Sequence, residues 1–337
     1  MTLPLLMALV VVALLVSRTM AGWIARNASR MELLDVPNER SSHVKPTPRG
    51  GGLGIATTAL MVSGLAWLAI PTDGRLILAV VVGGALVAGV GILDDRRGLP
   101  NHVRFVVHVL ASLVAVYAIG TPTVLQASGH VAFAMYAVGA CLCVAWSINA
   151  FNFMDGIDGM AAAHATIALS AIGIVSVLTS ADTMALVSFT TAAACVGFLQ
   201  LNWSPAKVFM GDVGSGFLGY LFGVLLVSSW ATEDVSGTLI PVVVAPFAVD
   251  ATFTLLARIA RRERWWRPHR SHVYQLAVRK GFSHARVAGA MSLLTLVGAA
   301  LAVLAHIAPL PFIALTYAYV VVLCAAWLIL HARWSNR

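Results

Sequence analysis

The chain has 337 residues, of which 59% are apolar or aromatic, and its mean hydropathy is +0.87. Only 11% of the residues are charged, less than half the roughly 25% that is typical of soluble domains. These figures exclude a soluble globule, a disordered chain and a nucleic-acid-binding module, and they predict an integral membrane protein. The net charge of +8 then reflects basic residues held on one side of a membrane.

Apolar stretches long enough to cross a bilayer recur along the chain. A transmembrane helix needs about 20 apolar residues, so the sequence predicts an all-α, polytopic protein with about 10 to 11 transmembrane helices. The connections are too short for a soluble domain, so residues 1–337 are expected to form one integral-membrane domain. The expected spans are 3–23, 53–70, 76–93, 105–120, 131–148, 160–178, 183–201, 213–231, 238–257, 287–307 and 311–331, of which the last two could form a re-entrant pair.

The charges of the connections predict an orientation. With the N-terminus outside and the spans alternating, every basic residue except Arg75 falls on the inner side or at the inner end of a span. This asymmetry is the positive-inside pattern, and it predicts a periplasmic N-terminus and a cytoplasmic C-terminus. The polar motifs also lie at the inner ends of spans, which favours an enzyme that joins a cytosolic substrate to a lipid head group.

The first inner motif is DVPNERSSHVKPTPRGGG, residues 35–52. Its prolines and glycines favour turns over a helix. Glycines beside Lys45 and Arg49 let backbone N–H groups approach an anion, so an anion site is expected here. The alternative is an ordinary basic cytoplasmic loop.

The second motif is LDDRRG, which places Asp94 and Asp95 at the end of the third span. Adjacent carboxylates at a membrane boundary are costly unless they bind a metal, pair with arginine or take part in proton chemistry. They could hold Mg²⁺ or provide a base or nucleophile. The alternative is a structural ion cluster with Arg96 and Arg97.

The third motif is NAFNFMDGIDG, residues 149–159, which contains no basic residue. Its two Asp-Gly steps predict a tight turn leading into the sixth span. Asn149, Asn152 and Asp155 recur every three residues, as do Asp155 and Asp158, which on a helical turn gathers them on one face. Because nothing in the segment neutralises the carboxylates, a bound cation or a hydrogen-bonded substrate is expected. The alternative is a set of turn and cap residues.

The fourth motif is NWSPAKVFMGDVGSG, residues 202–216. Asp212, between two glycines, could complete a metal and phosphate site with Lys207, and Phe209 could stack on a base. The alternatives are a helix cap for Asp212 and an interfacial anchor for Phe209.

The fifth motif is RWWRPHRSHVYQ, residues 264–275. Arginine and histidine donate hydrogen bonds to phosphate, which makes His269, Arg270 and His272 candidate ligands of a diphosphate. The alternative is a polybasic contact to anionic lipid head groups.

Acidic groups suited to a hard metal, together with glycine turns and basic groups, are typical of phosphoryl transfer. A competing interpretation is a transporter or flippase for lipid-linked or anionic substrates. In that case Asp250, His108 and His164, which lie inside spans, could form a proton path. These three residues are more often satisfied by hydrogen bonds between helices.

Taken in this order, the motifs PNERSSHVKPTPRGGG, LDDRRGLP, NAFNFMDGIDG, VFMGDVGS and PHRSH resemble those of a known family. The chain is similar to the polyprenyl-phosphate N-acetylhexosamine-1-phosphate transferases, the MraY/WecA/WbpL-type membrane enzymes. The resemblance extends from about Asp35 to His272 and includes the number of spans. It implies that undecaprenyl phosphate attacks the β-phosphate of a UDP-N-acetylhexosamine and releases UMP. Mg²⁺ is the implied cofactor, with Mn²⁺ as the alternative ion.

The resemblance also implies roles for individual residues. The catalytic pair maps jointly to Asp94 and Asp95, and the metal-binding residues map to Asp212 and Asp155. The implied nucleotide and substrate contacts are Asn152, Gly156, Asp158, Asn202, Phe209, Lys45, Arg49, His269, Arg270 and His272.

One departure bears on the substrate. The peptidoglycan branch carries three consecutive histidines where this chain has His-Arg-Ser-His. The resemblance is therefore closer to enzymes that begin O-antigen or other surface polysaccharides from UDP-GlcNAc, UDP-GalNAc, UDP-FucNAc or UDP-QuiNAc. The expected location is the bacterial inner membrane, the expected partners are the lipid bilayer and the two substrates, and a homodimer stays open.

Overall fold

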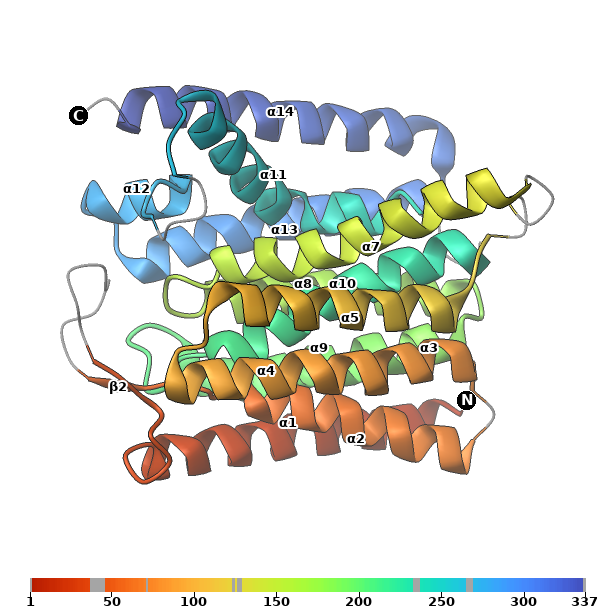
Figure 1. Cartoon of the computed structure of the whole chain (residues 1–337). Coiled ribbons are helices and arrows are strands. Elements are labelled where there is room, and N and C mark those ends of the chain that lie inside the picture. The colour runs from red at the N-terminus through yellow and green to blue at the C-terminus, as the bar shows by residue number, and fades with distance from the viewer. Residues whose placement is uncertain are drawn as a thin grey trace.

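The computed structural model of the protein describes residues 2–36, 46–70, 72–122, 125, 129–232, 237–264 and 269–335. Within them the fold is a helical bundle with one two-stranded antiparallel ribbon (Figure 1). The elements are α1 (Leu3–Asn27), β1 (Leu34–Asp35), β2 (Thr47–Pro48), α2 (Leu53–Ala69), α3 (Gly74–Leu78), the π-helix η1 (Ala79–Gly83), α4 (Gly84–Arg97), α5 (Asn101–Ile119), α7 (Gly129–Phe153), α8 (Met160–Leu178), α9 (Asp182–Asn202), α10 (Gly211–Thr232), α11 (Leu239–Ala260), α12 (Val273–Arg279), α13 (His284–Ile307) and α14 (Pro309–Ser335).

The predicted all-α membrane fold is confirmed. In the described part of the chain, ten helical stretches are long and apolar enough to cross a membrane, and α2, with 17 residues, is a shorter apolar helix at the position of the predicted second span. The elements α3, η1 and α4 form one continuous span, Gly74–Arg97. That span is longer than the predicted 76–93, so Asp94 and Asp95 lie within its last turns and not in a loop. The helices α13 and α14 have 24 and 27 residues, long enough for each to span by itself.

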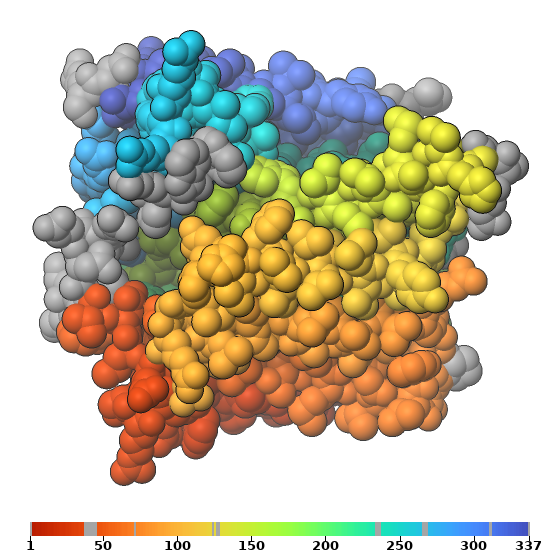
Figure 2. All heavy atoms as spheres, viewed as in Figure 1, coloured from red at the N-terminus to blue at the C-terminus, as the bar shows by residue number. Residues whose placement is uncertain are grey.

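The bundle is built around α10. In the most apolar stretch of α10, 94% of the residues are buried, whereas the corresponding share is 17% in α1 and in the last span. Small residues make this packing close, since Gly219 and Gly223 lie directly against the backbone of α7. The outer helices instead present apolar side chains, such as Leu113 and Tyr117 of α5 and Met135 of α7. Figure 2 shows this face, where α5 and α7 lie side by side.

The described parts of the five sequence motifs lie at one end of the bundle, which we call the motif end. The helices alternate in direction, so α2, α5, α8, α10 and α12 all begin there (Figure 1). The N-terminus lies at the opposite end of the bundle and the C-terminus at the motif end. This places the polar groups together at the ends of the helices and not along their length.

Candidate active site

The carboxylate of Asp95 holds the first turn of α10. Asp95 is 3% exposed, and its two oxygens accept hydrogen bonds from the backbone N–H groups of Asp212 and Val213, at 3.0 and 3.2 Å. These are unpaired donors at a helix N-terminus, where the helix dipole also favours a negative charge. Gly211 permits the approach, because a Cβ at that position would clash with the Asp95 carboxylate. Asp95 therefore fixes the position of Asp212.

Asp94 and Asp212 share a cation, Arg104. One terminal nitrogen of the guanidinium lies 2.7 Å from Asp94 Oδ2 and 2.8 Å from Asp212 Oδ2. The other donates to Asn101 Oδ1 at 2.6 Å. Sequence reasoning missed Arg104, because a single arginine at the start of a span is also what the positive-inside pattern produces. The expected alternative partners of the aspartate pair, Arg96 and Arg97, are both exposed.

Asn152 connects α7 to the same carboxylate. Its amide nitrogen lies 3.0 Å from Asp212 Oδ1 and 3.0 Å from Ser215 Oγ. The side chain of Asp212 is thus engaged by α5 and α7 and does not cap its own helix. The helix-cap alternative for Asp212 is therefore wrong, since Asp95 takes that role.

Asp155 lies in the turn after α7, close to Asp95 and Asp212. Burial raises the pKa of Asp155 well above its usual value, and the negative charges of Asp212 and Asp95 raise it further. None of the described residues donates a hydrogen bond to its carboxylate. We call Asp94, Asp95, Asp155 and Asp212 the acidic half of the site.

Asp158 has different neighbours from Asp155. Its carboxylate accepts a hydrogen bond from Ala206 N at 3.2 Å and lies 3.3 Å from His284 Nδ1. Burial by itself would raise the pKa of Asp158, but the hydrogen bond and charge of His284 outweigh it and hold that pKa below its usual value. The expectation that Asp155 and Asp158 share one helical face is wrong, because α7 ends at Phe153 and a turn separates them.

Two loops run beside each other across the acidic half. Gly51 N donates to Phe209 O at 2.9 Å, and Phe209 N donates to Pro48 O at 2.7 Å. Arg49 lies within electrostatic reach of Asp95, and its Nε is buried without a hydrogen-bond partner. The structure therefore brings Arg49 and Phe209 to the site, whereas Lys45 lies outside the described residues.

The side chain of Asn202 links two loops by hydrogen bonds to their backbones. It is 4% exposed, its amide oxygen accepts from Gly159 N at 3.0 Å, and its amide nitrogen donates to Val208 O at 2.9 Å. Both ends of the amide are therefore used within the protein.

A second buried carboxylate, Asp250 of α11, holds the first turn of α12. It is 4% exposed and accepts backbone hydrogen bonds from Val273 and Tyr274, at 2.9 and 3.3 Å. Trp327 Nε1 of α14 donates to it at 3.0 Å, and His272 Nδ1 lies 3.7 Å away. Because the backbone donors of α12 and the indole of Trp327 engage both carboxylate oxygens, the structure favours the interhelical interpretation of Asp250 over a proton path.

The segment His269–His272 leads into this turn. The rings of His269 and His272 are 4.9 Å apart, and Ser271 Oγ lies 2.9 Å from His269 Nδ1. Burial, with the positive charges of His272 and Arg258, lowers the pKa of His269 to about 4, so this imidazole is neutral at pH 7. One terminal nitrogen of Arg270 is buried without a hydrogen-bond partner. We call His269, Arg270, His272 and Arg258 the basic half of the site.

His164 and His108, the two histidines of the proton-path interpretation, have partners other than Asp250. His164 of α8 is fully buried, and its Nδ1 lies 2.8 Å from the hydroxyl of Thr295 in α13. His108 lies within electrostatic reach of Arg104 and Asp212, so it belongs beside the acidic half. These contacts match the interhelical alternative for His164.

The donor chemistry of the acidic half suits a divalent cation. Among the described residues no group of three or more His, Cys, Asp or Glu side chains is placed so that it could hold a metal ion as it stands. However, Arg104 already places a positive group between Asp94 and Asp212, and the Asp155 carboxylate has no donor among the described residues. Mg²⁺ takes oxygen ligands and keeps several waters, so it needs only one or two of these carboxylates.

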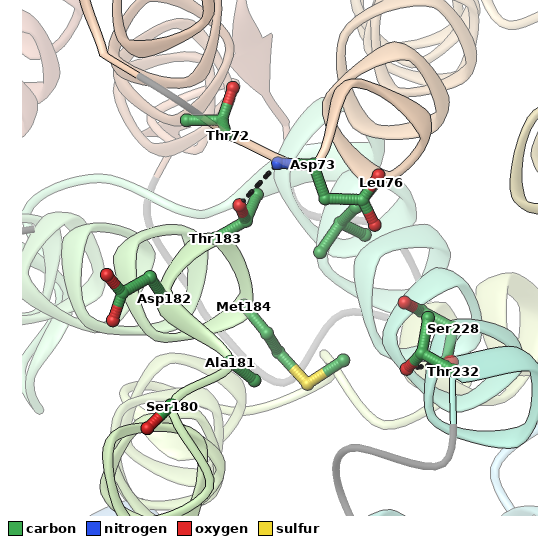
Figure 3. Close-up of a pocket in the computed structure, with 10 residues that line it drawn as sticks. All are labelled: Thr72, Asp73, Leu76, Ser180, Ala181, Asp182, Thr183, Met184, Ser228 and Thr232. Atoms are coloured by element: carbon green, nitrogen blue, oxygen red, sulfur yellow. Dashed lines mark hydrogen bonds between the residues drawn. The ribbon is translucent and has the colours of Figure 1, made fainter.

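A cavity of about 350 Å³ lies at the opposite end of the bundle and carries none of the predicted site residues. Figure 3 shows Asp73, Thr183 and Asp182 around it, with Asp73 N donating to the Thr183 hydroxyl at 2.7 Å. The motif end and this cavity are therefore separate features.

Known proteins resemble this chain over most of its length. The family described as glycosyl transferase family 4 matches residues 77–230. The chain is 34% identical to the decaprenyl-phosphate N-acetylglucosaminephosphotransferase of Mycolicibacterium smegmatis, over 79% of this chain and 73% of the relative. It is 30% identical to the probable undecaprenyl-phosphate N-acetylglucosaminyl 1-phosphate transferase of Bacillus subtilis, over 81% and 77%. A Salmonella typhi undecaprenyl-phosphate alpha-N-acetylglucosaminyl 1-phosphate transferase is 27% identical, over 82% and 76%.

Proposed function

Since the chain belongs to the polyprenyl-phosphate N-acetylhexosamine-1-phosphate transferases, a family of multi-pass membrane enzymes, we propose that it transfers GlcNAc 1-phosphate from UDP-GlcNAc to undecaprenyl phosphate. A phosphate oxygen of the acceptor forms a bond to the β-phosphorus of the donor. The bond from that phosphorus to the bridging oxygen breaks, and UMP leaves. The products are UMP and undecaprenyl-pyrophosphoryl GlcNAc.

One observation carries the proposal, namely the division of the motif end into an acidic and a basic half. Both halves meet at the turn after α7, where Asp155 lies near Asp212 and Phe153 lies 6.0 Å, ring to ring, from His272. The diphosphate of a sugar nucleotide needs a cation and arginine N–H groups on its oxygens. A transferase also needs the phosphates of its two substrates side by side.

We assign Mg²⁺, or Mn²⁺ in its place, to the acidic half, with Asp212 and Asp155 as its ligands. When bound, the ion would neutralise charge on the diphosphate. Asp94 and Asp95 are the catalytic pair, with Asp95 also orienting Asp212 through its two backbone hydrogen bonds. The guanidinium of Arg104 bridges Asp94 and Asp212 when no metal ion is bound between them.

We assign the donor to the remaining residues of the motif end. Arg49, Arg270 and His272 bind the diphosphate and sugar, and His269 contributes as a neutral imidazole. The uridine contacts are Asn152, Gly156, Asp158 and Phe209, with Asn202 holding the loops that carry them. The names of the three reported relatives support N-acetylglucosamine as the sugar. The product would begin a surface polysaccharide such as O-antigen.

The test is release of UMP by purified full-length protein. With undecaprenyl phosphate and UDP-GlcNAc we expect UMP only when Mg²⁺ or Mn²⁺ is added, and slower release with UDP-GalNAc. UMP release that persists with a chelator would contradict the metal assignment. Turnover of UDP-GalNAc as fast as UDP-GlcNAc would contradict the sugar assignment.

We also propose that the motif end faces the cytoplasm of a bacterial inner membrane. In a background without native cysteines, Lys280→Cys at the motif end should react with an impermeant maleimide only in inverted vesicles. Asp182→Cys at the opposite end should react in intact cells. Both side chains are exposed, and the reverse pattern would overturn the orientation.

A further inference from the structure

The side chain of Tyr274 lies between the two halves of the site. It is the second residue of α12 and is 2% exposed. Its hydroxyl donates a hydrogen bond to the backbone carbonyl of Phe153, at 2.8 Å. Its ring lies directly against Gly156, where an added Cβ would clash first with the Tyr274 hydroxyl. Tyr274 therefore contacts both ends of the turn that contains Asp155.

The backbone of Tyr274 is fixed from the other side. Asp250 accepts the N–H groups of Val273 and Tyr274, which ties the start of α12 to α11. The ring of His272 is flanked by Tyr274 and Phe153, with ring centroids 5.8 and 6.0 Å away. A continuous set of contacts thus runs from Asp250 through Tyr274 to the turn after α7.

The carbonyl of Phe153 depends on this contact. Phe153 is the last residue of α7, where carbonyl groups have no partner within the helix. The Tyr274 hydroxyl belongs to a buried side chain and supplies a donor to this partly buried carbonyl, and an acceptor that loses such a donor costs stability. Removing the hydroxyl should therefore let the turn shift, and Asp155 with it.

We propose that Tyr274 is a positioning residue that locks the Phe153–Gly156 turn to α12, so that Asp155 and the segment His269–His272 are held as one unit. The proposal rests on the proposed function, which makes Asp155 a metal ligand and the histidine segment a donor site. Metal binding in the acidic half and donor binding in the basic half are then coupled through this lock.

The first test compares Tyr274→Phe with Tyr319→Phe in the purified full-length protein. Tyr319 of α14 is the matched control, since its buried hydroxyl also donates to a backbone carbonyl, that of Leu294 at 2.7 Å, away from the site. The measurements are Mn²⁺ affinity by electron paramagnetic resonance, kcat and KM for UDP-GlcNAc, and the melting temperature.

We expect both variants to lose similar thermal stability. Only Tyr274→Phe should bind Mn²⁺ at least ~5-fold more weakly and lose at least ~10-fold in kcat/KM. Mn²⁺ affinity and kinetics equal to those of Tyr319→Phe would overturn the proposal. A Tyr274→Phe protein that fails to fold while Tyr319→Phe folds would also overturn it, because the role of Tyr274 would then be structural.

A second test uses the contact with Gly156. Gly156→Ala should lose activity, because its methyl group meets the Tyr274 hydroxyl first. In the double variant, Tyr274→Phe should restore part of the activity that Gly156→Ala loses. If the activity lost by the double variant equals the product of the two single losses, the lock is contradicted. An inactive wild type would refute the proposed function, whereas an active wild type with an unaffected Tyr274→Phe variant would refute the lock alone.

Discussion

Asp95 and Asp250 have the same local geometry in two different settings. Each is a buried aspartate of a spanning helix, Asp95 near the end of α4 and Asp250 midway along α11, and each accepts two consecutive N–H groups from the first turn of another helix. Asp95 holds the turn of Asp212 among three other carboxylates, whereas Asp250 holds the turn of Tyr274 beside His272 and Trp327. One arrangement thus builds an acidic half suited to a cation, and the other a basic half suited to an anion.

The largest effects should come from the acidic half. Asp95→Asn and Asp212→Asn should each lower UMP release at least ~100-fold, or about 2.7 kcal/mol. The reason is that each removes a charge that holds the cation or orients its ligand. The matched control is Asp182→Asn at the opposite end of the bundle, which should release UMP at the wild-type rate. Wild-type activity in both acidic-half variants would refute the catalytic assignment.

Arg104 should matter less than the carboxylates it joins. Arg104→Gln removes the positive group between Asp94 and Asp212, and we expect ~10-fold slower UMP release, about 1.4 kcal/mol. The exposed Arg97, the last residue of α4, provides the comparison, since Arg97→Gln should change activity by less than ~2-fold. Equal effects of the two substitutions would mean that the bridge has no role in the reaction.

The basic half should respond differently from the acidic half. Asp250→Asn keeps the size of the side chain but weakens its hold on the first turn of α12. We expect a KM for UDP-GlcNAc that rises ~5-fold, because His272 moves, with a smaller change in kcat. Steady-state kinetics at saturating Mg²⁺ measure this. If Asp250→Asn lowered kcat as strongly as Asp95→Asn does, the distinction between the halves would be lost.

The smallest of these effects should be the contribution of His269 to the pH dependence of stability. Its pKa of about 4 lies below the ordinary value of 6.5. The unfolded chain therefore binds the extra proton more readily between these values, and stability falls as the pH drops from 6.5 towards 4. His269→Gln should lose less melting temperature over that range than the wild type. Parallel pH profiles for the two proteins would contradict a neutral buried His269.

The sequence was enough to predict the spans and the end of the bundle where the chemistry lies. Apolar length and the positions of charges depend only on the local chain, so the spans around Asp94 and Asp212 follow from composition. The roles of Arg104 and Tyr274 do not, because a lone arginine or tyrosine near a helix start has many uses. Their contacts are to residues far away in the chain.

Two further features depend on packing that no local pattern encodes. Asp250 was open to interpretation as a proton carrier until its donors from α12 and α14 were located. The separation of Asp155 from Asp158 depends on where α7 ends, and a three-residue spacing alone suggested a shared face. In each case the side chain was recognised from the sequence, but its partner was supplied by the fold.

The most direct test of the two-half account is a Mn²⁺ titration followed by electron paramagnetic resonance on the wild type, Asp212→Asn and Asp250→Asn. We expect the wild type to bind Mn²⁺, Asp212→Asn to lose that binding, and Asp250→Asn to bind Mn²⁺ within ~2-fold of the wild type while binding UDP-GlcNAc more weakly. Mn²⁺ binding that survives Asp212→Asn, or that Asp250→Asn abolishes, would contradict the division of the site.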